Sequence, residues 1–247
     1  MNSKNIFVFL LFLSLSNLTK SQEFYKSYDW ESNPTYKIEN SDKDMIALKE
    51  KVVTEFYFEG QDLIEYYLEH KVLWLNSDDR IEEYNKIYLP FSNRSKLEVN
   101  KARVIKKNGE IIELDESKIL TAENEETGRT FKYFALEGVE KGSFIEYYYV
   151  EKRTPRFQGA RFDVQNGYEK LKVEFDLYAP SNLIFKFKSY NEIAEVAQDK
   201  SSSEKLHWQF SAVNVQGVDR EEQAPYNAAT GFIIYKLHQN LANNAII

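Results

Sequence analysis

The residue types that usually carry catalysis are scarce in this chain. Its 247 residues include no Cys and only three His, at positions 70, 207 and 238. Without Cys, the chain has no thiol nucleophile, no disulfide and no thiolate metal site. No two of the histidines have the i, i+2 or i, i+4 spacing that lets neighbouring imidazoles bind one ion. We therefore expect no metal site and no cofactor.

The histidines themselves are best explained by packing. His70 alternates with Leu68 and Val72 on a predicted strand, so its ring shares their face and we expect it at the edge of the core with a hydrogen-bonded ring. His207 precedes Trp208, so the two side chains should point to opposite faces.

Acidic residues are abundant, and they single out no site. A hydrolase with paired carboxylates needs two acids facing each other across a pocket, and with 39 acids the sequence cannot select a pair. The acids at 78, 79, 82 and 83 lack the ligand spacing and central Gly of a calcium loop, so a capped helical turn is expected there. Glu123, Glu125 and Glu126 are read as solvated residues of a loop over 122–129.

Aromatic residues are the other distinctive feature, with 17 Tyr, 17 Phe and 3 Trp. Neighbouring side chains of a strand point to opposite faces, so a run of tyrosines places at least one ring toward solvent or a second layer. This makes Tyr66, Tyr147 and Tyr149 the candidate binding residues, which could stack on sugar rings or anchor a protein partner. The competing interpretation, which we favour, is that these rings cover a sheet whose second face is also partly buried.

Short alternating segments provide the scaffold for these residues. The clearest alternation runs over 171–178 and places Leu171, Val173, Phe175 and Leu177 on one face. Residues 45–48 and 52–58 form a strand pair or one long bent strand, and 63–75 returns as an antiparallel hairpin partner.

The turns and helices between these strands are short. Asn108-Gly109 is expected to supply the two positive-φ positions of a tight hairpin turn, and a short helix is predicted over 192–198. About a dozen strands favour an all-β, antiparallel β-sandwich with very little helix, which can be divided into two packed halves near residues 154–155.

The first residues have the pattern of a secretory signal peptide. Lys4 is followed by an apolar run over 6–13 and then by small and polar residues, so cleavage is expected after residue 21. The apolar run is about half the ~20 residues that span a bilayer, which makes an uncleaved anchor the minority interpretation. We expect a protein exported to the periplasm or beyond, with an irregular segment over 22–43, the β-sandwich over 44–240 and a tail over 241–247.

The charge balance restricts the partners. The formal net charge is −7 and there is no basic run, so the chain is a poor candidate for binding nucleic acid or an anionic membrane. Nothing after the first residues predicts stable insertion into a membrane.

Three stretches together resemble a known family: residues 102–112, residues 135–147 followed by Thr154-Pro155, and residues 208–222 with Pro225. In this order and spacing they resemble domain of unknown function 3857, the β domain that precedes transglutaminase-like cores in exported bacterial proteins. The resemblance extends over about 44–240. One departure is Ser143, where the family usually has Asp, and Ser can serve the same turn.

The resemblance implies an immunoglobulin-like β-sandwich in the bacterial envelope, with catalysis in a following core that uses Cys, His and Asp. None of these catalytic residues can be carried over, because this chain has no Cys. We therefore expect an accessory domain encoded alone or a truncated product. It would be a non-enzymatic binding or scaffolding domain with a protein partner in the envelope, transglutaminase-like or protease-like. A carbohydrate-binding module with exposed aromatics and, less favoured, a hydrolase with paired carboxylates are the alternatives.

Overall fold

The computed structural model describes residues 23–89, 95–124, 129–201, 205–219, 226–243 and 245–246. The predicted signal peptide and the loop acids Glu125 and Glu126 lie outside the described residues. The fold is all-β and sandwich-like, as predicted. No helix within the described ranges is both long and apolar enough to cross a membrane.

The largest sheet has eight strands in the order β12-β13-β10-β1-β2-β8-β4-β5. Its strands, in chain order, are β1 (Met45–Glu59), β2 (Asp62–Leu75), β4 (Ser95–Ile105), β5 (Ile111–Glu113), β8 (Ser143–Arg153), β10 (Glu169–Ala179), β12 (Ala197–Asp199) and β13 (Leu206–Val215). We call it the large sheet.

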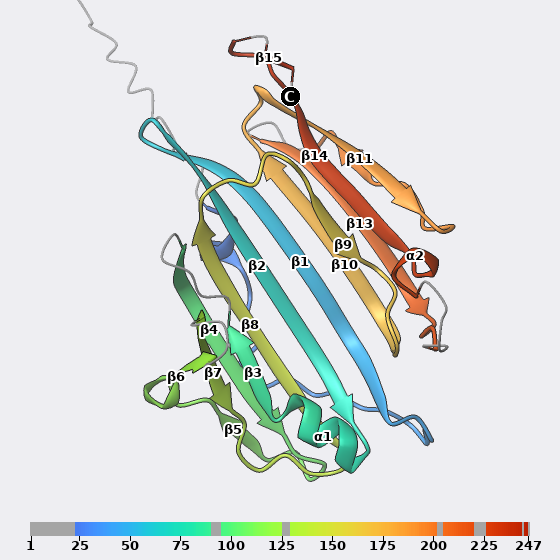
Figure 1. Ribbon diagram of the computed structural model, residues 1–247. Coiled ribbons are helices and arrows are strands. Elements are labelled where there is room, and N and C mark those ends of the chain that lie inside the picture. Colours follow the sequence, from blue (N-terminus) through green and yellow to red (C-terminus); the bar gives the residue numbers. More distant parts are fainter. Residues whose placement is uncertain are drawn as a thin grey trace, which may run out of the picture.

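Two smaller sheets pack on it. The β14 sheet contains β9 (Ala160–Asp163), β11 (Leu183–Tyr190), β14 (Phe232–Asn240) and β15 (Ala245–Ile246), and the β7 sheet contains β3 (Lys86–Leu89), β6 (Leu120–Asn124) and β7 (Arg129–Ala135). Figure 1 shows the β14 sheet in front of β10 and β13, and the β7 sheet in front of β4 and β8. Short helices complete the fold: η1 (Phe24–Ser27), α1 (Asp78–Tyr84), η2 (Glu116–Lys118) and α2 (Tyr226–Ala229).

Each small sheet closes its own hydrophobic core against the large sheet. Phe175 and Phe210 pack with Phe185 and Tyr235 under the β14 sheet. Under the β7 sheet the members of the core are Leu73, Ala102, Ile145, Ile87 and Phe134. Tyr67 of β2 packs against both cores, so the two small sheets cover the same face.

The opposite face of the large sheet is covered by the N-terminal segment, residues 23–43. Apart from η1 it is irregular, as predicted, but its aromatic side chains are not merely solvated. Tyr28 and Trp30 pack against Tyr148, and Tyr36 packs against Phe144. The large sheet is therefore buried on both faces over much of its area.

Several local predictions hold. Residues 45–59 form the long bent strand, with a bulge between Ala47 and Lys49, and pair with β2 as the predicted hairpin. Ser77 caps α1 by accepting a hydrogen bond from the backbone of Arg80. Ser143 does serve the predicted turn, because its hydroxyl accepts from the backbone N–H of Glu140.

Other predictions are corrected. The sandwich is not purely antiparallel, because β1 and β10 pair in parallel and thereby join the two halves into one sheet. Only Gly109 of the Asn-Gly pair has positive φ, so the turn is of the three-residue kind in which one left-handed glycine closes a type I turn. No helix forms over 192–198, because Asn191 and Glu192 both adopt positive φ and β12 follows.

Four short strands occupy segments for which no strand is predicted. They are β6, whose last residues fall in the expected loop over 122–129, β9, β12, and β15, which lies in the expected tail. Each has five residues or fewer, and segments this short carry too little periodicity to be recognised.

Candidate functional site

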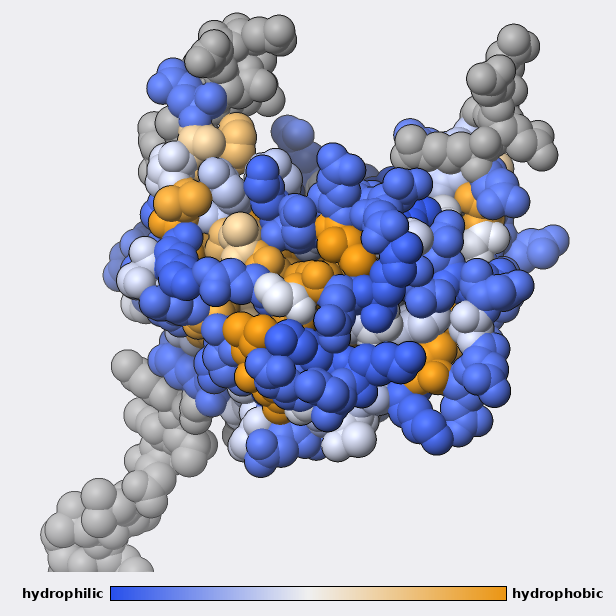
Figure 2. Space-filling model, turned by 90° about the horizontal axis from the view of Figure 1, so that it is seen from below, coloured by the Kyte–Doolittle hydropathy of each residue, from blue (hydrophilic) through white to orange (hydrophobic). Residues whose placement is uncertain are grey.

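Between the two small sheets, a groove crosses the middle of the large sheet. Its largest cavity has a volume of about 550 Å³, followed by cavities of about 530 and 300 Å³. The first two share Asn166 and Tyr226, and the second and third share Arg80 and Tyr168, so the three form one continuous groove. We call it the interlobe groove. Figure 2 views the end of the molecule that carries α1, where hydrophilic residues cover most of the surface and hydrophobic ones show near its middle.

The floor of the groove contains a buried ion pair between β1 and β10. Lys170 is 1% exposed and Glu50 is 5% exposed. The Lys170 Nζ lies 2.5 Å from Glu50 Oε2, and the Tyr168 hydroxyl donates to Glu50 Oε1 at 2.5 Å. Lys71 Nζ lies 4.0 Å from Glu50 Oε1. Glu50 is therefore surrounded by two cations and one hydroxyl donor.

This pair is placed by an irregularity in both strands. Ala47 is opposite Lys170, but the next interior pair is Glu50 opposite Val173, one residue further on than simple alternation gives. As a consequence Lys170, and not Leu171, points to the sandwich interior. Leu171 packs on the opposite face, so its predicted place with Val173 is wrong.

A second carboxylate lies on the same floor. The oxygens of Glu69 accept from Tyr67 at 3.1 Å and from Tyr149 at 3.2 Å, and Lys71 Nζ is 3.2 Å from Glu69. Lys71 thus contacts both acids and lies between them. The floor of the groove is a network in which each charge has partners of opposite sign.

The pKa values show how this network is balanced. Burial alone would raise the pKa of Glu50, but Lys71 and Lys170 outweigh it, and the pKa is lowered. Burial lowers the pKa of Lys170 despite its bond to Glu50, whereas neighbouring anions hold the pKa of Lys71 well above its usual value. A general acid of a glycosidase needs a raised carboxyl pKa. Glu50 has the opposite, so Glu50 does not meet this requirement for a general acid, and with its cations it forms an ion-pair cluster.

The structure buries all three predicted binding tyrosines. Tyr149 contributes its hydroxyl to Glu69 of the groove floor, and Tyr147 lies beside it in the core under the β7 sheet. Neither ring is exposed, because the β7 sheet covers that face of β8. The interpretation that we favoured, tyrosines covering a doubly buried sheet, is confirmed.

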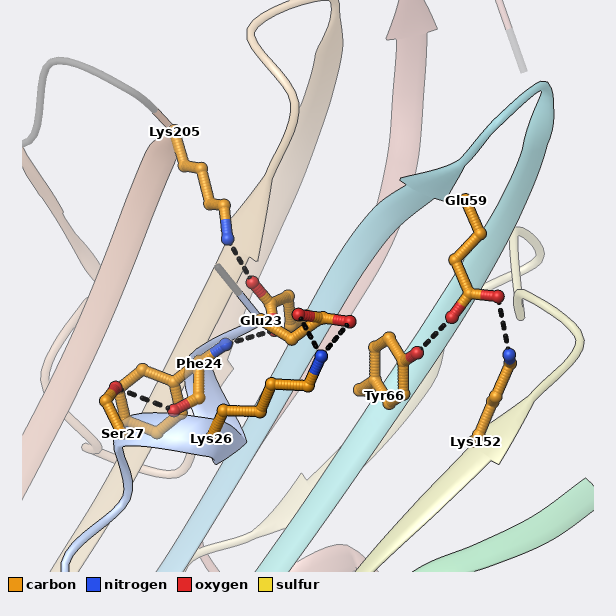
Figure 3. Close-up of polar contacts among 9 residues, drawn as sticks. Glu23, Phe24, Lys26, Ser27, Glu59, Tyr66, Lys152 and Lys205 are labelled. Atoms are coloured by element: carbon orange, nitrogen blue, oxygen red, sulfur yellow. Dashed lines mark hydrogen bonds and ion pairs between the residues drawn. The ribbon is translucent and has the colours of Figure 1, made fainter. Parts of the chain in front are cut away.

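Tyr66 lies on the other face, away from the groove. Its hydroxyl donates to Glu59, which also pairs with Lys152 at 2.6 Å, and its ring packs 5.1 Å from that of Tyr25. Figure 3 shows this contact beside the first turn of the N-terminal segment, where the backbone N–H of Phe24 is anchored. Tyr66 is therefore part of the docking of that segment.

His70 and His207 are held in hydrogen-bonded networks outside the cavities of the groove. As predicted, His70 is a core-edge residue whose ring is satisfied on both sides, 2.9 Å from Glu146 and 2.7 Å from the Tyr28 hydroxyl. Burial lowers the pKa of His70. His207 points away from Trp208, again as predicted, and lies between Asp176 and Asp199. No cluster of three or more His, Asp or Glu suited to a metal ion occurs in the part of the chain that the structure describes.

One exposed aromatic cluster was not predicted. On the outer face of the β7 sheet, Tyr88 is 60% exposed, with its ring 5.4 Å from Phe131 and 5.9 Å from Tyr133. Leu120 lies opposite Tyr133 and is also exposed. Strand alternation over 86–89 and 129–135 could have indicated this face, because Ile87 and Phe134 occupy the buried one.

Comparison with known proteins identifies the family. The model of the family described as "Domain of Unknown Function with solved-structure structure (DUF3857)" matches residues 65–218. Among solved structures, 91 chains match. One is a protein of Parabacteroides distasonis ATCC 8503 described as a candidate protease, with a TM-score of 0.69 and 12% sequence identity. The match covers 78% of this chain but 40% of that protein, and at this identity it shows a shared fold. No curated protein matches the chain.

Proposed function

The chain belongs to the DUF3857 family, and from this premise we propose that it is a non-catalytic binding or scaffolding module of the bacterial envelope. In this proposal the chain is exported and accompanies a protease-like or transglutaminase-like partner. The fold shared with 40% of the length of a candidate protease supports an accessory role, since the same domain there is joined to a larger remainder.

The observation that carries the proposal is the interlobe groove. The charges on its floor pair with one another, which supports a structural use of these groups. Its rim carries the side-chain amides of Gln165, Asn166 and Asn227 and the phenol of Tyr226, and of these Gln165 and Asn166 also bond within the chain. Such groups bind the backbone of an extended segment by hydrogen bonds. We therefore assign the groove to a segment of the protein partner.

Two rim substitutions test this assignment. The double variant Tyr226→Ala/Asn227→Ala removes a hydroxyl and an amide without touching the Glu50–Lys170 pair. Immobilised wild type should retain a discrete envelope protein that the double variant loses, whereas a Tyr88→Ala control on the distant β7 sheet retains it. Equal retention by all three proteins would contradict a binding role for the groove.

The non-catalytic part of the proposal has its own test. Purified protein should give no turnover of casein and no amine incorporation into a glutaminyl substrate. Turnover that co-purifies with the protein and falls in the variant Glu50→Gln would overturn it. For export, residues 1–21 fused to a reporter should direct it out of the cytoplasm, and a cytoplasmic reporter would contradict this.

A carbohydrate-binding module is the second candidate, favoured by the exposed ring of Tyr88 with the half-buried rings of Phe131 and Tyr133 beside it. Aromatic rings on a sheet surface can stack on the apolar faces of sugars. A glycan array with wild type and Tyr88→Ala tests it: binding that depends on Tyr88 supports this candidate, and the absence of any binding removes it.

A further inference from the structure

Three lysines gather on the outer face of the β14 sheet. Lys186 and Lys188 lie two residues apart on β11, so they point to the same side, and Lys236 of β14 lies directly opposite Lys186. All three are exposed. Among the described residues, none of the three forms an ion pair. We call this the lysine face.

This arrangement is unusual for a chain with an excess of acids. Like charges directly opposite each other on neighbouring strands destabilise the sheet. The chain has 39 acidic and 32 basic residues, yet acids pair with none of these three lysines in the described structure. An anionic ligand that bridges these lysines would relieve their mutual repulsion.

Stacked aromatic rings extend the lysine face along β11 and β14. Tyr190 and Phe232 stack with centroids 4.7 Å apart and an interplanar angle of 16°. Lys188 Nζ lies 5.2 Å from the Tyr190 ring, and Arg161 covers the Phe232 ring at 3.7 Å. The faces of these two rings are therefore covered by each other and by cations. The surface that they form is flat and charged, and neither ring protrudes from it as an apolar side chain.

We propose that the lysine face binds a linear acidic polysaccharide, lying along β11, with its carboxylate or sulfate groups on Lys186, Lys188 and Lys236. Residues two apart on a strand are about 7 Å from each other, so Lys186 and Lys188 lie in line along β11, and Lys236 lies beside Lys186 on β14. This spacing suits a polymer that carries one charge per sugar unit. Ile234, which lies opposite Lys188 on the same face and is partly exposed, offers an apolar contact for a sugar ring.

The spacing and the flatness favour this ligand over two other polyanions. Duplex DNA carries one charge per about 1.7 Å of axis, roughly four times denser than the spacing of about 7 Å between Lys186 and Lys188. An anionic membrane surface is bound most tightly when apolar side chains also penetrate it, and here the two rings are stacked under cations. The inference does not rest on the interlobe groove.

Binding to polygalacturonate at low salt tests the proposal, with neutral dextran as the comparison polymer. We expect wild type to bind polygalacturonate and not dextran, with an affinity that falls as salt rises. The triple variant Lys186→Glu/Lys188→Glu/Lys236→Glu should lose roughly ten-fold or more in affinity. A matched variant, Lys86→Glu/Lys107→Glu/Lys200→Glu, has the same net charge with the lysine face intact and should keep most of the affinity.

Folding and alternative ligands are controlled separately. The single variant Lys236→Gln relieves the like-charge pair, so it should fold at least as stably as wild type while binding polygalacturonate more weakly. Equal affinity of wild type and the triple variant, equal losses in both triple variants, or the absence of any binding at low salt would overturn the proposal. Binding to vesicles of anionic phospholipid that requires the lysine face, without binding to polygalacturonate, would also overturn it in favour of a membrane surface.

Discussion

The substitution Lys170→Met tests the buried ion pair on which the floor of the groove depends. Met preserves much of the length of the side chain and removes its charge. In the variant, Glu50 remains buried and keeps the Tyr168 hydroxyl at 2.5 Å and the more distant Lys71 Nζ at 4.0 Å. It loses the cation that lies closest to it, 2.5 Å from Oε2.

The expected magnitude follows from this geometry. Removing one partner of a buried pair destabilises a protein by about 3–5 kcal/mol, because the other charge is left uncompensated. Tyr168 and Lys71 still stabilise the carboxylate of Glu50, so we expect the lower end, about 3 kcal/mol. For a chain of this size each kcal/mol shifts Tm by about 2–4 °C, which gives a decrease of roughly 6–12 °C.

Urea unfolding at pH 7, followed by Trp and Tyr fluorescence, measures this loss. Lys236→Met is the matched control, since it removes an exposed lysine and should change the free energy of unfolding by no more than about 0.5 kcal/mol. In wild type the lowered pKa of Glu50 means that the carboxylate contributes stability above its unfolded pKa, and this is lost as pH falls through the folded value. In Lys170→Met that contribution is already lost at neutral pH, so the difference between the two proteins should shrink in acid.

Two outcomes would refute the reasoning. A Lys170→Met protein within about 1 kcal/mol of wild type would mean that the ion pair does not hold Glu50 in place. A difference that stays constant down to acidic pH would mean that the loss comes from packing and not from an uncompensated carboxylate.

Two further predictions concern other parts of the fold. Although burial opposes it, Asp176 and Asp199 raise the pKa of His207. The contribution of His207 to stability is therefore complete below its unfolded pKa of about 6.5 and is lost as pH rises through the folded value. The free energy of unfolding of His207→Gln, measured between neutral and mildly alkaline pH, should lack this decline, and parallel pH profiles of wild type and variant would contradict it. Phe56→Ala should destabilise the protein by about 3–5 kcal/mol because Phe56 is 1% exposed. Phe58, two residues along the same strand, is 43% exposed, so Phe58→Ala should change the free energy of unfolding by about 0.5 kcal/mol. Comparable losses of both variants in thermal scans would show that the burial pattern of β1 is misassigned.

Much of the fold could be predicted because its determinants are local. Alternation over 173–178 and the hairpin of residues 45–58 with 63–75 required only a period of two, and Ser77 before an acidic run is a sufficient signal for α1. The parallel pairing of β1 with β10 had no such signal. These strands are more than a hundred residues apart, and pairing over that distance depends on how the two small sheets pack.

The candidate site was largely hidden for the same reason. Whether Tyr66 or Tyr149 is exposed depends on what packs against each face of the large sheet. The N-terminal segment covers Tyr66, and the β7 sheet covers Tyr149. The lysine face is equally non-local, because Lys236 joins Lys186 only through the register of β11 and β14. Sequence reasoning treated the absence of a basic run as the absence of a basic surface, and the fold brings the lysines together.

The buried ion pair also bears on how β1 and β10 find their register. A slip of one residue would turn the side chains of a strand to the opposite face, and both faces here are buried, so hydrophobicity alone distinguishes the registers poorly. Glu50 and Lys170 come from strands 120 residues apart, and only the native register brings them together with Tyr168. Replacing both by apolar residues, as in Glu50→Leu/Lys170→Met, should therefore restore most of the stability lost in Lys170→Met, since a well-packed apolar pair is often at least as stable as a buried ion pair. If the pair specifies register, the double variant should nevertheless give poorly dispersed or duplicated amide resonances for β1 and β10, whereas a single sharp set with native chemical shifts elsewhere would show that packing alone fixes the register.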